Sequence, residues 1–194
     1  MMQPFDGSNK QAVVRQALEQ FWQTWPESTS SVGAALRLFG SQYNAADSSK
    51  SCQDTLLLSA PRQIPTGFGG LMDTAEARGM APVAEALYAA TGDFYTGQKK
   101  AVVLITDSGD TCAGDPCNWA VTQYHDAGLV MPVYVIDLGG KSGLECLATA
   151  SGGRYFAVDQ AAGLQDALNQ SLSAFTIQAN PAGADLTPAT QANP

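Results

Sequence analysis

An apolar run in the middle of the chain ends at a carboxylate. Residues 101–107 read AVVLITD, and Asp107 is followed by Ser108, Gly109 and Asp110. An Asp at the end of a buried strand can ligate a metal ion, anchor a polar group of a partner, or accept backbone N–H bonds in a turn. The residue types alone leave these three roles open.

Four cysteines are candidates for disulfide bonds: Cys52, Cys112, Cys117 and Cys146. Zinc ligands usually have two-residue gaps, whereas four residues separate Cys112 from Cys117. We expect Cys112 to pair with Cys117, leaving the other two cysteines paired or free; the alternative joins Cys52 to Cys112. Because disulfides form in oxidising compartments, the sequence predicts an extracytoplasmic protein, whether periplasmic, secreted or on the cell surface.

The hydrophobic pattern predicts the elements that position these residues. Helices are expected over residues 10–25, 81–94, 117–128, 143–153 and 161–175, and strands over residues 31–40, 54–60, 101–107, 131–140 and 154–159. Strands that are apolar on both faces and alternate with helices indicate a doubly wound α/β fold. We therefore expect a mainly parallel sheet that is flanked by helices on both faces.

The length of 194 residues fits one domain and a tail. Residues 1–177 are predicted to form the domain, and residues 178–194, rich in Ala, Pro and Thr, to form a linker or disordered tail. The formal net charge of −8, without a Lys or Arg cluster, speaks against nucleic acid as a partner. Since no run reaches about 18 apolar residues, membrane insertion is not expected.

Three stretches resemble a von Willebrand factor type A domain of the bacterial, exported kind. They are RGMAPVAEAL at residues 78–87, VVLITDSGDTC at residues 102–112 and ATASGGRYFAVDQAAGLQDAL at residues 148–168, within a resemblance that covers roughly residues 10–175. The resemblance implies a non-enzymatic module for protein binding or cell adhesion. It also implies that loops at the carboxyl edge of the sheet contact another protein or an extracellular ligand.

Domains of this type commonly carry a metal ion-dependent adhesion site. It combines Asp-x-Ser-x-Ser after the first strand, a Thr, and an Asp at the end of a later strand, and these oxygen ligands suit Mg²⁺. Asp107 matches the last position, whereas Ala81 stands at the Thr position and has no side-chain oxygen. We therefore expect Mg²⁺ or another divalent cation to bind weakly or not at all.

The resemblance places the partner contact around Asp107, Asp110 and Ala81. Asp110 and Asp115 follow the strand but do not match the spacing of a calcium-binding loop. They are interpreted as solvated loop charges.

The Asp-x-Ser-x-Ser motif can be placed in two ways. In the first, DGSNK at residues 6–10 is a degraded motif in which Asp6 and Ser8 remain as metal ligands and Lys10 replaces the last Ser. The lysine ammonium would then repel a divalent cation and replace its charge.

In the second placement, which we favour, residues 1–10 are the loop that follows the motif. Lys10 then opens the first helix, and Pro4 is no longer forced into a central strand, where it is unsuitable. The first strand is then either absent from this chain or replaced by a short strand at residues 1–5.

Two other functions are weighed against protein binding. A metal-free structural or assembly module is the alternative. A hydrolase or nucleotide enzyme is the least favoured, because the chain has no Gly-x-Ser-x-Gly motif and LGGKSGL at residues 138–144 lacks the first Gly of a phosphate-binding loop.

Overall fold

The computed structural model describes residues 4–5, 8–24, 32–62, 68–73, 75–95 and 99–179. Asp6 and residues 180–194 lie outside these ranges, so the predicted tail is covered only at its first two residues. None of the helices in the described ranges is both long and apolar enough to cross a membrane.

The strands form three separate sheets. The first sheet is parallel, in the order β5-β6-β7, and consists of β5 (Val102–Thr106), β6 (Val133–Leu138) and β7 (Tyr155–Val158). The second is an antiparallel pair of β3 (Ala34–Phe39) and β4 (Thr55–Arg62). The third is a hairpin of two short strands, β1 (Pro4–Phe5) and β2 (Ser8–Asn9). The prediction of parallel strands is confirmed for β5, β6 and β7. One continuous, doubly wound sheet is not found, because no backbone pairing joins β3 to β5 in the described part of the chain.

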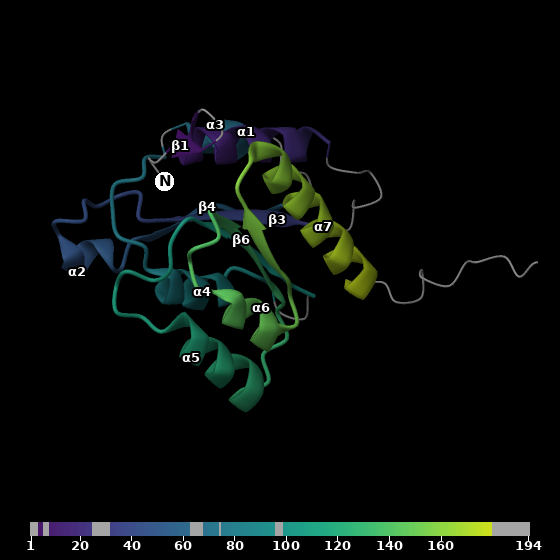
Figure 1. Cartoon of the computed structure of the whole chain (residues 1–194). Helices are drawn as coiled ribbons and strands as arrows, with labels where there is room; N and C mark the ends of the chain where they lie inside the picture. The colour runs from purple at the N-terminus through teal and green to yellow at the C-terminus, as the bar shows by residue number, and fades with distance from the viewer. Residues whose placement is uncertain are drawn as a thin grey trace, which may run out of the picture.

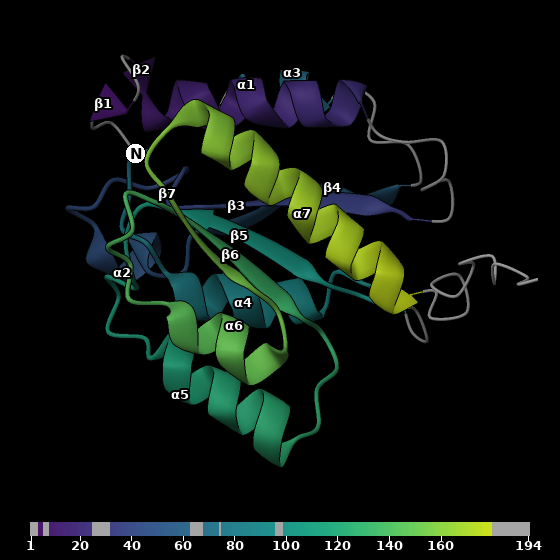
Figure 2. The ribbon, with the colours of Figure 1, turned by 45° about the vertical axis from the view of Figure 1, so that its right-hand side comes forward.

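Helices cover both faces of the strands (Figures 1 and 2). One face carries α1 (Lys10–Gln23), α3 (Phe68–Met72) and α7 (Ala161–Ala179). The other face carries α4 (Val83–Thr91), α5 (Pro116–Ala120) with its π-helical continuation η2 (Val121–Asp126), and α6 (Glu145–Ser151). A short helix, α2 (Ser48–Ser51), interrupts the loop between β3 and β4.

The buried side chains of β6 belong to two hydrophobic clusters, one on each face. Ile136 and Leu138 pack with α1 and α7, whereas Val133 and Val135 pack with α4 and α6. This alternation follows the two-residue period of a strand. Every residue of β6 is buried, which explains its nearly continuous apolar sequence and makes it the strand that anchors both helix layers.

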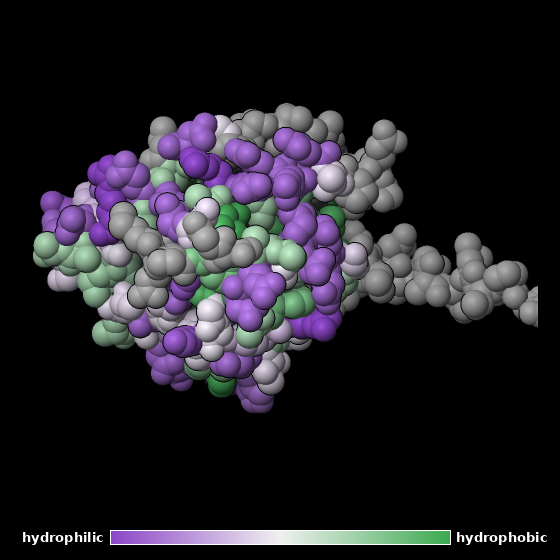
Figure 3. Space-filling model, turned by 45° about the horizontal axis from the view of Figure 1, so that its top comes forward, coloured by the Kyte–Doolittle hydropathy of each residue, from purple (hydrophilic) through white to green (hydrophobic). Residues whose placement is uncertain are grey.

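The helical face seen from the top is mainly hydrophilic on its outside (Figure 3). Hydrophobic residues gather at the centre of this view, within a rim of hydrophilic ones. These hydrophobic residues lie on the visible surface. Val14 and Leu18 of α1, by contrast, are buried at 5% and 7% exposure, so the apolar side of this amphipathic helix packs into the core.

The N-terminal residues that the structure describes form no strand of the main sheet. Pro4 and Phe5 pair with Asn9 and Ser8 in a hairpin outside the main sheet, so they do not replace a central strand. Helix α1 begins at Lys10, and the Asn9 side chain caps it by accepting a hydrogen bond of 2.7 Å from the Ala12 N–H. These contacts favour the placement in which Lys10 opens the first helix.

Candidate functional site at the carboxyl edge of the sheet

Asp107 lies directly after β5, and Lys10 reaches it from the start of α1. The Lys10 Nζ is 3.5 Å from the Asp107 Oδ2 and donates a hydrogen bond of 2.7 Å to the carbonyl oxygen of Leu138. The side chains of Lys10 and Asp107 are 10% and 17% exposed, so solvent screens their attraction only in part. A positive charge of the chain itself therefore lies beside the carboxylate.

The side chain of Ala81 has no hydroxyl group, but the hydroxyl group of Thr111 lies next to the Ala81 backbone. The Ala81 N–H donates to the Thr111 Oγ1 at 2.7 Å, and the Thr111 N–H donates back to the carbonyl oxygen of Ala81 at 3.0 Å. The sequence did not identify Thr111, because this pair joins segments 30 residues apart. The loop after β5 thus supplies an oxygen at the start of α4.

Asp110 organises the loop after β5 and is not a solvated charge. Its Oδ1 accepts hydrogen bonds from the N–H groups of Cys112 and Gly114 at 2.8 and 3.1 Å, and its Oδ2 accepts one from the Ala84 N–H at 2.9 Å. The interpretation as a loop charge is therefore wrong. Asp110 ties this loop to the first turn of α4, where backbone N–H groups lack helical partners.

Asp115 is also structural. Its side chain caps α5 by accepting a hydrogen bond of 2.9 Å from the Asn118 N–H. Asp115 is exposed, in agreement with its interpretation as a solvated charge, and its carboxylate also satisfies one of the unpaired donors of this helix.

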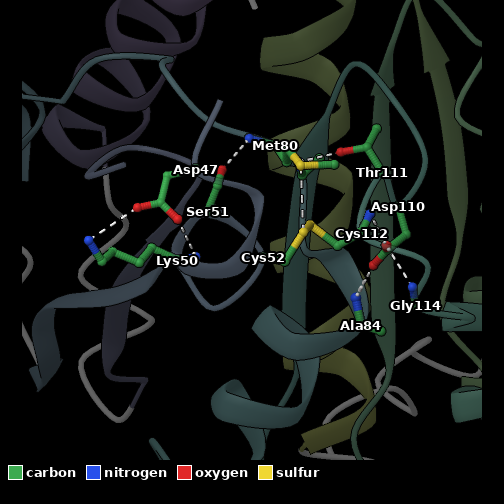
Figure 4. The surroundings of a disulfide bond; sticks show 11 residues. Asp47, Lys50, Ser51, Cys52, Met80, Ala84, Asp110, Thr111, Cys112 and Gly114 are labelled. Atoms are coloured by element: carbon green, nitrogen blue, oxygen red, sulfur yellow. Dashed lines mark hydrogen bonds and ion pairs between the residues drawn. A yellow bond between two sulfur atoms is a disulfide. The ribbon is translucent and has the colours of Figure 1, made fainter. Parts of the chain in front are cut away.

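The disulfides join Cys52 to Cys112 and Cys117 to Cys146. The expected bond between Cys112 and Cys117 is therefore wrong, and the alternative link from Cys52 to Cys112 is present. Figure 4 shows this bond beside Met80, with Asp110 and its amide donors next to it. The bond fastens the loop between β3 and β4 to the loop after β5 at the carboxyl edge.

A second carboxylate, Asp137, lies at the carboxyl end of β6 and is fully buried. It accepts hydrogen bonds from the Ser142 N–H at 2.6 Å and from the Tyr155 hydroxyl at 2.7 Å. Burial alone would raise the pKa of Asp137, but the hydrogen bonds from Ser142 and Tyr155 outweigh it and leave the pKa below the ordinary value. Burial and the Asp137 carboxylate raise the pKa of Tyr155 to about 12.

The loops after β5 and β6 are in close contact. A Cβ atom added at Gly109 would lie 2.6 Å from the carbonyl oxygen of Ser142, a distance too short for a side chain. Glycine is therefore needed where the loop after Asp107 crosses the loop that Asp137 holds. The two carboxylates thus fix adjacent parts of one surface.

Sequence comparison finds relatives without an established function. No family model matches the chain. The uncharacterized proteins YwmD and YwmC of Bacillus subtilis are 26% and 28% identical over 186 and 164 residues. The matches cover 91% and 80% of this chain, and 81% and 70% of the two relatives.

Structure comparison identifies the fold. The SpRpn10 VWA domain has a TM-score of 0.67 at 14% sequence identity, with 88% of each chain covered. The chain has a von Willebrand factor type A-like fold. BatB from Bacteroides thetaiotaomicron has a TM-score of 0.65 at 14% identity, with 91% of this chain and 93% of BatB covered. An aerotolerance-related membrane protein from Bacteroides fragilis has a TM-score of 0.63 at 14% identity, with 86% of this chain and 89% of that protein's chain covered.

The residues around Asp107 fit a divalent cation poorly, although von Willebrand A-like folds often bind one. Lys10 places an ammonium beside the carboxylate, and Ala81 offers no oxygen. Ser8 is exposed and pairs with Phe5 in the hairpin, and Asp6 lies outside the described residues. In the described ranges, no group of three or more His, Cys, Asp or Glu side chains is arranged to hold a metal ion.

Proposed function

We propose that this von Willebrand A-like domain is a non-enzymatic module that binds another protein through its carboxyl-edge loops. These loops follow β3, β5 and β6, and the contact is centred on Asp107, Asp110 and Ala81. The observation that supports this function most is the partly accessible carboxylate of Asp107 on a surface that the chain holds rigidly. A bond from Cys52 to Cys112 and three hydrogen bonds to Asp110 restrain this surface, which lowers the ordering cost of binding.

The contact works with little or no contribution from Mg²⁺. In a metal-dependent site, the cation would neutralise Asp107 and attract an acidic group of the partner. Here the Lys10 ammonium, 3.5 Å from Asp107, supplies the positive charge. This replacement of the cation by a lysine is the central claim of the proposed function.

The proposed location of the protein is extracytoplasmic. Two disulfides are typical of proteins in oxidising compartments, and cysteines in the cytosol are usually kept reduced. A partner on the cell surface, in the periplasm or in the extracellular medium agrees with this location.

We expect Asp107→Ala to weaken binding of the partner by about tenfold or more, because a hydrogen bond to a charged group contributes about 1.5–3 kcal/mol. The partner is first identified by photo-crosslinking from a probe placed at Ser108. Its dissociation constant is then measured by calorimetry with the wild type and the variant, both in a metal chelator.

Asp126→Ala is the matched control for this measurement. It also removes one carboxylate, but Asp126 is exposed at the end of η2, before β6 begins, and therefore far from the carboxyl edge. The control should bind like the wild type. An unchanged dissociation constant for Asp107→Ala would place the contact elsewhere and leave the metal-free assembly module as the better function.

A further inference from the structure

The two disulfides restrain different kinds of structure. Cys117 and Cys146 lie on α5 and α6, which pack against each other, and Cys146 also packs against a buried hydrophobic cluster of the core. Cys52 ends α2 in the loop between β3 and β4, and Cys112 lies in the loop after β5. One bond therefore joins two packed helices, whereas the other joins two loops.

The loop around Cys112 has no anchor in the core. We name residues 110–114 the clamped loop; the structure describes all of them, and none belongs to the buried hydrophobic core. Hydrogen bonds of Asp110 and Thr111 hold the clamped loop, together with the disulfide. Segments with few buried apolar contacts open locally at low free energy, so the order of the clamped loop depends on these restraints.

The backbone of the clamped loop is strained at Ala113. Its φ is +60°, the only positive φ of a residue other than glycine in the described ranges. This left-handed region is unfavourable for a residue with a Cβ atom. The N–H groups on either side, of Cys112 and Gly114, both donate to the Asp110 carboxylate. The strained conformation is therefore held from both sides, and the disulfide at Cys112 is the covalent part of this restraint.

The same bond lies next to the surface of the proposed contact. Cys112 follows Thr111, whose hydroxyl accepts a hydrogen bond from the Ala81 N–H. The Cys52 sulfur is 3.6 Å from the sulfur of Met80, the residue before Ala81 (Figure 4). The bond thus ties together the segments that meet at Ala81, and its loss would loosen this part of the surface.

We propose that the bond between Cys52 and Cys112 is a redox-sensitive clamp, which an external dithiol reduces in the folded protein. A thiolate of the dithiol attacks one sulfur of the bond, forms a mixed disulfide and releases the other cysteine as a thiolate. The second thiolate of the dithiol then displaces the remaining cysteine and closes the dithiol's own disulfide. Two electrons and two protons pass from the dithiol to the cysteines, and the clamped loop is loosened.

The bond between Cys117 and Cys146 is the comparison that the chain itself supplies. All four cysteines are half-buried, so the difference between the bonds lies in their surroundings. Attack by a thiolate requires access to a sulfur atom. Cys146 has the core cluster on one side, whereas exposed residues stand on both sides of Cys112 along the chain. We therefore expect the clamp to be reduced first.

The regulatory meaning of the clamp rests on the proposed function, because the clamped loop carries Asp110 of the proposed contact. In an oxidising compartment the clamp is closed, and a dithiol reductant would loosen the contact surface. Reduction and loop order are both measured without a partner. A partner contact found elsewhere would therefore contradict the proposed function and leave the clamp itself intact.

The first test follows reduction of the folded wild-type chain by dithiothreitol. Samples are quenched with iodoacetamide at successive times, and alkylation of each cysteine is measured by peptide mass spectrometry. Cys52 and Cys112 should be alkylated at least about tenfold faster than Cys117 and Cys146, because their bond is the more accessible one. Equal rates, or faster reduction of Cys117 and Cys146, would overturn the proposal.

The second test measures loop order in a variant that keeps only the clamp, Cys117→Ser with Cys146→Ser. Amide hydrogen exchange is recorded with and without dithiothreitol. Exchange at Cys112 and Gly114, whose N–H groups donate to Asp110, should become at least about tenfold faster on reduction. Unchanged exchange at these two amides would show that the bond does not control the loop and would also overturn the proposal.

The matched control keeps only the other bond, in the variant Cys52→Ser with Cys112→Ser. Its reduction should leave exchange at the Trp119 amide unchanged, because this N–H donates to the Asp115 carbonyl oxygen inside a helix that packs against α6. An increase at Trp119 as large as that at Cys112 would contradict the distinction between a clamp and a structural bond.

Discussion

Replacing both Cys52 and Cys112 by Ser should lower the free energy of unfolding by about 4 kcal/mol. The bond joins residues 60 apart, and closing a loop of this size removes conformational entropy from the unfolded chain. For a domain of this length, such a loss corresponds to a fall in melting temperature of roughly 8–16 °C. Urea unfolding of the oxidised wild type and the double variant measures the difference directly.

The second disulfide is the matched control for the first. Cys117 and Cys146 are 29 residues apart, so replacing both by Ser should cost about 0.6 kcal/mol less than removing the longer loop. The Cys52 and Cys112 variant should also lose the fastening between two carboxyl-edge loops and show faster exchange at Thr111. Equal stability of the wild type and the Cys52 and Cys112 variant would contradict this bond in the native protein.

Asp137→Ala should lower the free energy of unfolding by about 3 kcal/mol. Asp137 is fully buried, and its loss would leave the Ser142 N–H and the Tyr155 hydroxyl without their acceptor. The conservative Tyr155→Phe removes only one of the two donors and should therefore cost less than Asp137→Ala. A loss for Asp137→Ala no greater than that for Tyr155→Phe would contradict the assigned network.

The pH dependence gives this network a second signature. The pKa of Asp137 is lower in the folded chain than its ordinary value of 3.8, so its carboxylate stabilises the fold above that value and loses this effect as the pH falls through the folded pKa. Tyr155 has a raised pKa of about 12, so its contribution is present below the ordinary value of 10 and is lost as the pH rises through about 12. Asp137→Asn should show a shallower loss of stability in acid than the wild type.

The sequence predicted the elements whose patterns are strong and local. The run VYVIDL is apolar on both faces because β6 is buried between two helix layers, and this made its parallel setting predictable. The π-helical turn at residues 121–126 could not be distinguished from an α-helix, since both have an amphipathic helical pattern. Helix α3 was missed because the glycines in FGGLM indicate a turn.

The candidate site was predictable only in part, because its contacts join distant segments. Asp107 could be identified because it follows the apolar run of a predicted strand. Its contact with Lys10 could not, because the two residues are 97 positions apart along the chain. Cys112 and Cys117 are the closest pair along the chain, yet Cys117 lies on α5, which packs against α6 and Cys146. Short separation was therefore a poor guide to pairing, since the loop after β5 is held by Asp110 across to α4.

The most direct test of the central claim is a thermal melt of the 194-residue chain in a chelator, in millimolar Mg²⁺ and in millimolar Mn²⁺. If Lys10 supplies the charge beside Asp107, the three melting temperatures should coincide. A cation at about 100 times its dissociation constant would stabilise the fold by about 2.7 kcal/mol and raise the melting temperature by several degrees. Such a rise would show that the carboxyl edge binds a metal ion and would contradict the replacement of the cation by Lys10.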